Sequence, residues 1–247
     1  MKPVSRVIVT GAAGGLGSAT VSAYLAAGHE VFGLDRVSSP KQPSFTPVVV
    51  DLRDEDAMRV VMEEIGPVNH VVSIAGGALP DEKSATDLSR LPLAVFRTSL
   101  EHNLVSAFIT LQTGLPNLRA AQGDRSIAFT TSTDAMISYG LPAYAAAKSG
   151  IIGLVNSLTT PLGAEGIRIN AVAPGDIPTA RNRAEWAHRP DWYADLAAAN
   201  PLRRLCTPEE IAQTFLALSD GITSMTGQTI VVDAGLIRGQ VPVTRGH

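Results

Sequence analysis

The chain has 247 residues, of which 45% are apolar and 17% charged, so it carries enough apolar surface to bury one large core. A formal net charge of −3 excludes the basic surface that nucleic-acid binding needs, and the single cysteine, Cys206, excludes an intrachain disulfide and fits a reducing compartment. No run reaches membrane-spanning length, and the N-terminal apolar stretch meets Gly11 without a signal-peptide pattern. We therefore expect a cytoplasmic protein with neither nucleic acid nor a membrane as its partner.

Short β-branched runs alternate with helical stretches along the chain, a pattern that predicts a parallel sheet covered by helices on both faces. The predicted strands are Val4–Thr10, His29–Leu34, Pro47–Val50, Val68–Ile74, Ser126–Thr131, Ile167–Val172 and Thr229–Val232. The predicted helices are Gly15–Ala27, Glu55–Ile65, Leu100–Ala121, Ala143–Ala164, Arg181–Ala199 and Pro208–Ser219. Two connections, Gly76–Leu91 and Gly175–Leu205, are longer than a connector needs, and such segments bind ligands in open parallel sheets. We predict a single-domain, Rossmann-type α/β fold with a doubly wound parallel sheet and a substrate lid around residues 176–206.

A glycine-rich turn, from Thr10 to Gly17, lies directly between the first predicted strand and the first predicted helix. A dinucleotide pyrophosphate needs backbone N–H groups at close range and the positive end of a helix dipole, and only glycine lets the backbone come that near. Gly11, Gly15 and Gly17 are the candidates for this close approach. The alternative is a glycine-rich turn without a ligand, but the flanking strand and helix favour a dinucleotide.

Acidic residues follow the second and third predicted strands. Asp35 stands where a carboxylate would accept hydrogen bonds from the adenosine ribose and repel a 2′-phosphate, which predicts NAD(H) over NADP(H). Arg36 follows at once, however, and could accommodate a phosphate. Asp51 has two interpretations: it contacts the adenine amine, or it starts a turn or caps a helix.

Tyr144 and Lys148 are four residues apart where a predicted helix begins, so their side chains share one helix face. A free tyrosine titrates near pH ~10, so a base near neutrality needs a pKa depression of roughly two to three units, of which a neighbouring cation supplies about one to three. Lys148 could therefore supply most of the depression, and an oxidised nicotinamide the rest. By itself the Tyr-x-x-x-Lys pattern often occurs by chance, and the alternative is an ordinary pair on a helix surface.

From about Val4 to Gly235 the sequence resembles the short-chain dehydrogenase/reductases. The matching segments, in order, are Thr10–Gly17, Asp51-Leu52, Ala75-Gly76, Asn103, Ser132, Tyr144 with Lys148, Asn170 with Pro174–Thr179, Pro208–Ala212 and Thr226-Gly227-Gln228. So many separate matches in the same order are not expected by chance.

The resemblance implies a role for each matching side chain. Tyr144 would exchange a proton with the substrate oxygen, and Lys148 would hold the nicotinamide ribose and lower the tyrosine pKa. Ser132 would hydrogen-bond the substrate carbonyl, and Asn103 would place a water that connects Lys148 to solvent. Pro174, Ile177 and Thr179 would lie along the nicotinamide carboxamide. The cofactor-binding residues expected in total are Gly11, Ala13, Gly14, Gly15, Leu16, Gly17, Asp35, Arg36, Asp51, Leu52, Ala75, Gly76, Tyr144, Lys148, Pro174, Gly175, Ile177 and Thr179.

The sequence departs from the family pattern at two places. Ser73-Ile74 replaces the asparagine pair that commonly precedes Ala-Gly, which removes an amide often used to pin neighbouring strands. The gap from Ser132 to Tyr144 is one residue shorter than usual, so Thr131 stands at the usual spacing. We favour Ser132 as the catalytic hydroxyl, because a strand alternates its faces and Ser at the end of Thr130-Thr131-Ser132 fits the family best.

Other polar residues have ordinary explanations. The histidines at 29, 70, 102, 188 and 247 show no metal-ligand spacing, so we expect no metal, and His102 is expected on a helix surface or in the core although it stands beside Asn103. Cys206 is expected to be structural. The arginines of the lid either clamp a carboxylate or phosphate of the substrate or form a solvated face. They are Arg181, Arg183, Arg189, Arg203 and Arg204, and the aromatic residues beside them, Trp186, Trp192 and Tyr193, either meet an apolar substrate or pack the lid down.

Together these residues predict an NAD(H)-dependent oxidoreductase that interconverts a secondary alcohol and a ketone. One alternative is an NADPH-dependent reductase of 3-oxoacyl thioesters, against which Asp35 speaks. The other is a non-catalytic nucleotide sensor, which has no need of Asn103, Ser132, Tyr144 and Lys148 together. The resemblance also implies a homo-oligomer, a tetramer or a dimer, joined through the predicted helices Leu100–Ala121 and Ala143–Ala164.

Overall fold

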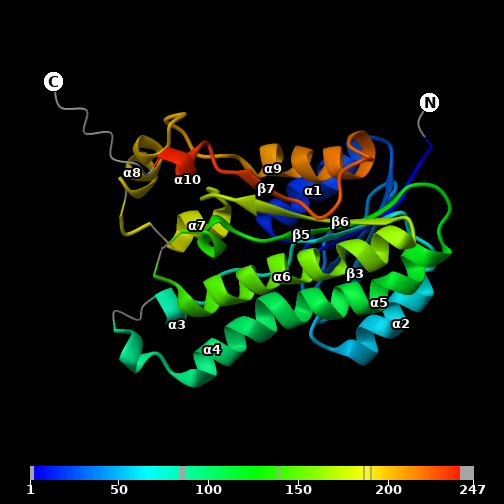
Figure 1. The fold of residues 1–247 in the computed structure, drawn as a ribbon. Coiled ribbons are helices and arrows are strands. Elements are labelled where there is room, and N and C mark those ends of the chain that lie inside the picture. Colours follow the sequence, from blue (N-terminus) through cyan, green and yellow to red (C-terminus); the bar gives the residue numbers. More distant parts are fainter. Residues whose placement is uncertain (1–2, 84–86, 138–139, 186, 190, 240–247) are drawn as a thin grey trace.

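The structure is a computed structural model that describes residues 3–83, 87–137, 140–185, 187–189 and 191–239. Seven parallel strands form one sheet in the order β3-β2-β1-β4-β5-β6-β7 (Figure 1). They are β1 (Arg6–Thr10), β2 (Glu30–Asp35), β3 (Phe45–Val49), β4 (His70–Ser73), β5 (Arg125–Thr130), β6 (Ile167–Pro174) and β7 (Thr229–Val232). The strand order reverses between β1 and β4, which confirms the predicted Rossmann-type, doubly wound sheet.

Helices cover both faces of the sheet (Figure 1). On one face lie α2 (Glu55–Ile65), α4 (Leu93–Leu100), α5 (Ser106–Ala120) and α6 (Pro142–Ala164), and on the other α1 (Gly15–Ala26) and α9 (Pro208–Leu216). Successive residues of a strand enter different apolar layers: Ile8 of β1 packs in the layer of α2, α5 and α6, whereas Val7 and Val9 pack in the layer of α1 and α9. Because both faces are buried, the strands read as nearly continuous apolar runs.

Short elements form the connections. They are α3 (Pro80–Lys83), α7 (Ala180–Glu185), α8 (Trp192–Ala199), α10 (Leu236–Gly239), two 3₁₀ turns (Leu88–Arg90 and Thr133–Ala135) and two π turns (Glu101–Val105 and Ala217–Gly221). In Figure 1 α3, α7, α8 and α10 gather at the left of the molecule. Within the described ranges, no helix combines the length and apolarity needed to cross a bilayer.

The predicted strands agree with the observed ones to within two residues at each end, and the predicted helices differ at three places. The predicted helix Leu100–Ala121 extends back to Leu93, because α4 continues through the π turn Glu101–Val105 into α5. The predicted helix Arg181–Ala199 is wrong, since α7 ends at Glu185 and α8 begins at Trp192, with Pro190, which has no amide hydrogen, between them in the sequence. The α-helical part of Pro208–Ser219 ends at Leu216 and continues as the second π turn.

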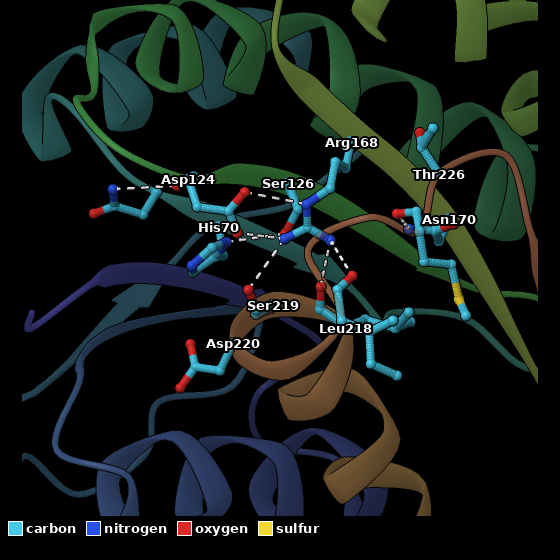
Figure 2. Close-up of polar contacts among 12 residues, drawn as sticks. His70, Asp124, Ser126, Arg168, Asn170, Leu218, Ser219, Asp220 and Thr226 are labelled. Carbon is cyan, nitrogen blue, oxygen red and sulfur yellow. Dashed lines mark hydrogen bonds and ion pairs between the residues drawn. The ribbon is translucent and has the colours of Figure 1, made fainter. Parts of the chain in front are cut away.

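A buried arginine ties the amino ends of β5 and β6 to the end of α9 (Figure 2). The guanidinium of Arg168 donates to both carboxylate oxygens of Asp124 and to the main-chain carbonyls of Leu218 and Ser219. Arg168 is only 8% exposed, so these acceptors replace the water that its charge would otherwise need. The π turn after α9 is therefore anchored to the amino ends of the strands, opposite the end of the sheet where their carboxyl ends lie.

His70, at the start of β4, lies beside this cluster and meets the hydroxyl of Ser126 at 2.9 Å from its Nδ1 atom (Figure 2). Burial lowers the pKa of His70 to about 4, because a charged imidazole would lose its hydration there. The unfolded chain, in which the pKa is near the ordinary value of 6.5, thus binds a proton first as the pH falls.

We expect His70 to make the folded state less stable in mild acid. Its contribution is complete above pH ~6.5 and is lost as the pH falls toward about 4, so the free energy of unfolding should fall by about 2 kcal/mol between pH 7 and pH 5 through this residue alone. Urea unfolding of the wild type and of His70→Asn at both pH values measures the effect. An equal fall in both proteins would contradict the assignment to His70.

Candidate active site

A cavity of about 570 Å³ opens at the carboxyl ends of the strands, where the order reverses between β1 and β4. It extends from the glycine turn after β1, past the ends of β2 and β4, to the start of α6 and the segment after β6. All but one of the predicted cofactor-binding residues line it, as do Ser132, Tyr144 and Lys148. Ala13 and Asn103 are not among the described residues of its wall.

The glycine turn at one end of the cavity has no room for a side chain at Gly11 or Gly17. Gly11 has a φ of +69° and donates its N–H to the carbonyl of Leu34 at 2.8 Å, which joins the turn to β2. A Cβ atom on Gly17 would lie 1.9 Å from the carbonyl oxygen of Gly11. α1 begins at Gly15 with no side-chain cap and no acidic residue in its first turn. The turn and helix end therefore fit an anionic pyrophosphate.

Asp35 ends β2 and lines the cavity next to the glycine turn. Its carboxylate accepts the N–H of Ala13 at 3.0 Å and the N–H of Val37 at 3.2 Å. Ala13 thus acts on the site by holding Asp35 rather than by lining the cavity. Arg36 also faces the cavity, so the predicted ribose acceptor and the alternative phosphate-binding group stand side by side.

Asp51 and Arg53 line the same end of the cavity as a pair. Arg53 Nη2 lies 2.7 Å from Asp51 Oδ2, and the hydrogen bonds from Arg53 lower the pKa of Asp51 to about 2. Asp51 also starts a turn, because its carbonyl accepts the N–H of Asp54 at 3.0 Å. The alternative that Asp51 caps a helix is wrong, since the N-cap of α2 is Asp54, whose side chain accepts the N–H of Ala57.

The opposite end of the cavity is formed by the first turns of α6. Lys148 Nζ lies 5.6 Å from the centroid of the Tyr144 ring and donates to the carbonyl of Thr130 at 2.9 Å, so the predicted pair does share one face. Burial lowers the pKa of Lys148 to about 8. A residue that sequence reasoning missed, Glu82 of α3, fixes this helix end: its buried carboxylate accepts the N–H groups of Ala143 and Tyr144 at 2.7 and 3.0 Å.

The expected depression of the Tyr144 pKa by Lys148 is not what the structure shows. Removal from water raises the pKa of Tyr144, and the nearby carboxylate of Asp134 raises it further. The groups that lower it are the hydroxyl of Ser132 and the charge of Arg181. The expected depression rested on Lys148 and an oxidised nicotinamide and left out burial and the charges that other segments bring to Tyr144.

The two candidate hydroxyl groups after β5 point to different partners. Thr131 donates to the main-chain carbonyl of Lys148 at 2.7 Å, so its hydroxyl is used inside the fold. Ser132 donates to Asp134 Oδ2 at 2.7 Å and lies close enough to Tyr144 to lower its pKa. This geometry favours Ser132 as the hydroxyl available for chemistry.

Asn103 lies beneath the loop that follows β4 rather than in the cavity. Its Oδ1 accepts the N–H of Gly77 at 2.8 Å, and its Nδ2 donates to the carbonyls of Gly77 and Ser99 at 3.2 and 3.0 Å. Gly76 is packed so closely on it that a Cβ atom there would lie 2.5 Å from the Asn103 oxygen. The Asn103 side chain is thus fully used in holding Gly76 and Gly77, and its predicted role with a water remains a prediction.

The segment after β6 closes the cavity from the other side. Thr179 faces Gly15, where a Cβ atom would lie 3.0 Å from the threonine side chain, and Asn182 Nδ2 donates to the carbonyl of Ile177 at 2.9 Å. Trp192 of α8 and Arg181 of α7 also line the cavity. Trp186, which was predicted for this lid, lies outside the described residues.

The remaining arginines of the predicted lid have other surroundings. Arg183 lies over the ring of Tyr193 and donates to the carbonyl of Pro178, and Arg189 lies over the ring of Trp192. Arg203 donates to the carbonyl of Ala198, and Arg204 pairs with Glu210. Of these residues and Arg181, only Arg181 belongs to the described cavity wall.

Two other side chains singled out in the sequence are Cys206 and His102. Cys206 is buried, and burial raises the pKa of its thiol. His102 lines the cavity but is partly buried, and burial lowers its pKa. Nowhere among the described residues do three or more His, Cys, Asp or Glu side chains form a group that could hold a metal ion.

Several residues of the cavity wall were not predicted from the sequence. Arg53 and Asp134 each stand two residues after a predicted site residue, which is the only sequence signal that pointed to them. Gly77, Ala78 and Asn182 also line the cavity and lie in the two long connections that were predicted to bind ligands, whereas Ser106 and Leu141 line it and carried no sequence signal.

Comparison with known proteins agrees with this geometry. A family model described as enoyl-(acyl carrier protein) reductase matches residues 11–237. The chain is 29% identical to the probable galactose dehydrogenase of Rhizobium meliloti over 93% of this chain and 94% of that one, and 31% identical to carbonyl reductase [NADPH] 2 of Sus scrofa over 94% and 96%. The crystal structure of an oxidoreductase of the short-chain dehydrogenase/reductase family from Burkholderia thailandensis superposes with a TM-score of 0.86, at 30% identity over 96% of this chain and 94% of that one.

The Rossmann-type sheet and the cavity at its switch point define an oxidoreductase that acts on CH–OH groups. The chain belongs to the short-chain dehydrogenase/reductase family, whose members use NAD(P).

Proposed function

We propose that this protein interconverts a secondary alcohol and a ketone with NAD(H), with Tyr144 as the general acid and base. The observation that carries the proposal is one continuous cavity, lined at one end by the glycine turn and at the other by Ser132, Tyr144 and Lys148. The turn at Gly11 and Gly17, where a Cβ atom would lie 2.9 and 1.9 Å from backbone atoms, brings the main chain to the cavity without side chains and fits the pyrophosphate of a dinucleotide.

Different residues of the chain move the proton at the substrate oxygen and stabilise its charge. A bound nicotinamide accepts or donates the hydride. Tyr144 takes the hydroxyl proton when the alcohol is oxidised and returns it when the ketone is reduced. Ser132 hydrogen-bonds the same oxygen and stabilises the charge that develops there. Lys148, whose Nζ lies 5.6 Å from the centroid of the Tyr144 ring, binds the nicotinamide ribose. Because burial and Asp134 hold the proton on Tyr144, oxidation is expected to accelerate as the pH rises.

The preference for NAD(H) is supported by the fixed carboxylate of Asp35, which would lie against a 2′-phosphate. Arg36 and Arg53 line the same end of the cavity, but Arg53 is already paired with Asp51. The carbonyl reductase relative is named for NADPH, and a reductase of 3-oxoacyl thioesters that uses NADPH is the corresponding alternative. Asp35 is the observation that weighs against it.

Replacing Asp35 by asparagine should shift the cofactor preference toward NADPH. The substitution removes the negative charge but keeps an oxygen for one of the two backbone N–H groups, so the ratio of kcat/KM for NADPH to that for NADH should rise by about 10- to 100-fold. Steady-state kinetics with both cofactors measures this ratio. Arg36→Gln is the matched comparison and should lower the same ratio or leave it unchanged. A wild-type preference for NADPH would show that the Asp35 interpretation is wrong.

The proposal is tested by fluorescence titration of the protein with NADH and NADPH, followed by a panel of cyclic, sugar-like and acidic alcohols and ketones. Binding of NADH together with turnover of at least one alcohol supports it. Binding without turnover of any alcohol or ketone would contradict the proposed chemistry and favour a nucleotide sensor.

We further propose a cytoplasmic homo-oligomer joined through α4–α5 and α6. Phe108 of α5 is 45% exposed and Leu93 of α4 is 60% exposed, so the surface of this long helix offers apolar contacts to a second copy. Light scattering of the purified protein distinguishes a monomer from a dimer or tetramer.

A further inference from the structure

Arg181 lies across the substrate end of the cavity. It belongs to α7, yet its guanidinium reaches the loop after β4, where a Cβ atom on Gly77 would lie only 2.1 Å from Arg181 Nη2. Tyr144 lines the same cavity, and the charge of Arg181 lowers its pKa. The residue therefore bridges the two walls of the cavity beside the proposed point of reaction.

Arg181 is an exposed residue, and within the part of the chain that the structure describes its guanidinium forms no hydrogen bond or ion pair. This distinguishes it from Arg183 on the same helix, which donates to the carbonyl of Pro178 and lies over Tyr193. A guanidinium offers five N–H donors in a planar fork that matches a carboxylate, and it is more weakly hydrated than an ammonium group. Such a group beside a reacting centre binds an anion of the ligand.

We propose that Arg181 binds a carboxylate of the substrate, so that this enzyme oxidises hydroxy acids to oxo acids. The inference rests on the proposed function, because it places the reacting hydroxyl at Tyr144. Hydride leaves the carbinol carbon for the nicotinamide ring of NAD⁺, and the hydroxyl proton passes to the phenolate form of Tyr144 and from there to solvent, so that oxo acid, NADH and one released proton result. The carboxylate stays on Arg181 throughout and orients the carbinol carbon.

Two acidic side chains determine which anion fits. Asp134 and Asp176 line the same cavity as Arg181, and both raise the pKa of Tyr144. They repel a second negative charge, so a singly charged carboxylate is favoured over a doubly charged phosphate ester. The pyrophosphate of the cofactor is the other anion that could reach Arg181, and the experiment separates the two.

The test compares 2-, 3- and 4-hydroxy acids with their primary amides, which have the same shape but no charge. The variants are Arg181→Gln and Arg181→Lys, with Arg183→Gln as the matched control that removes a charge from the same helix outside the cavity wall. We expect wild type and Arg183→Gln to prefer the best acid over its amide by at least about tenfold in kcat/KM. Arg181→Gln should lower kcat/KM for the acid by about 30- to 100-fold. The amide should lose much less, only through the effect of the missing charge on the Tyr144 pKa, which both substrates share, and Arg181→Lys should lie between wild type and Arg181→Gln.

Binding provides a readout without turnover. Calorimetric titration of the matching oxo acids into enzyme saturated with NAD⁺, a pair that cannot react, should give a Kd about 10- to 100-fold weaker in Arg181→Gln. The Kd of NADH should change by less than about threefold in this variant. If Arg181→Gln instead weakens NADH and affects acid and amide equally, Arg181 serves the cofactor and the proposal is overturned.

The remaining outcomes of these experiments also support or overturn the carboxylate site. Equal use of acids and amides by wild type, or an acid preference that survives in Arg181→Gln, overturns the carboxylate site while leaving the alcohol dehydrogenase intact. If neither acids nor neutral alcohols are oxidised, the proposed function fails. Oxo-acid binding that depends on Arg181 would still support the anion site in that case, and its absence would overturn it.

Discussion

Replacing Tyr144 by phenylalanine is expected to lower kcat by at least about 100-fold, the low end for loss of a general acid and base. The Tyr144 hydroxyl lies in the cavity beside Ser132, and the charges of Asp134 and Arg181 act on it. Phenylalanine keeps the ring over which Lys148 lies and removes only the proton carrier. The NADH dissociation constant should therefore stay within about threefold of the wild-type value.

Tyr193→Phe is the matched control for this experiment. Tyr193 belongs to α8, and its buried hydroxyl has no hydrogen-bond partner among the described residues. Removal of that hydroxyl should leave kcat unchanged. Single-turnover measurements of both variants at saturating cofactor separate the chemical step from product release. A Tyr144→Phe enzyme with wild-type turnover would remove Tyr144 from the mechanism.

The fold was largely predictable because its signals are local. A parallel sheet buried on both faces requires apolar runs, and these runs located all seven strands. The bounds of the helix Glu55–Ile65 followed from the acidic residues before it and the glycine after it, because Asp54 accepts the N–H of Ala57 and Gly66 ends the helix with a φ of +73°. The prediction of one helix over Arg181–Ala199 in the lid was wrong, because no apolar periodicity there distinguishes one helix from two short ones.

The candidate site was predictable where residues act near their neighbours in sequence. The glycine turn and the pair of Tyr144 and Lys148 each lie within one turn of chain, so spacing alone brings them together. The pKa values of the site residues could not be predicted from such local spacing. The pKa of Tyr144 depends on burial and on Asp134 and Arg181, which reach it from other segments.

Positioning residues were missed for a similar reason. Glu82 caps α6 from 61 residues away in the sequence, and it lies in a connection that looked like an ordinary loop. Asn103 was singled out by resemblance, but its contacts with Gly77 depend on the π turn between α4 and α5, which periodicity does not reveal.

Replacing Gly17 by alanine is expected to weaken NADH binding by at least about 100-fold or to destabilise the fold by about 2–4 kcal/mol. The added Cβ atom would lie 1.9 Å from the carbonyl oxygen of Gly11 and 2.6 Å from its carbonyl carbon. Both are backbone atoms of the turn itself, so no side chain can move aside. The turn must separate from α1, and the backbone N–H groups that fit a pyrophosphate separate with it.

Gly14→Ala is the control within the same turn, because its Cβ atom would lie 3.2 Å from the Gly11 oxygen, a contact that a small shift relieves. Gly153→Ala, in an open part of α6, controls for the general effect of alanine and should raise stability by about 0.5–1 kcal/mol. Urea unfolding and NADH titration of the three variants distinguish a local loss of binding from loss of the fold. If Gly17→Ala binds NADH as tightly as the wild type, the glycine turn is not the pyrophosphate site, because a turn displaced by that contact cannot present the same N–H groups.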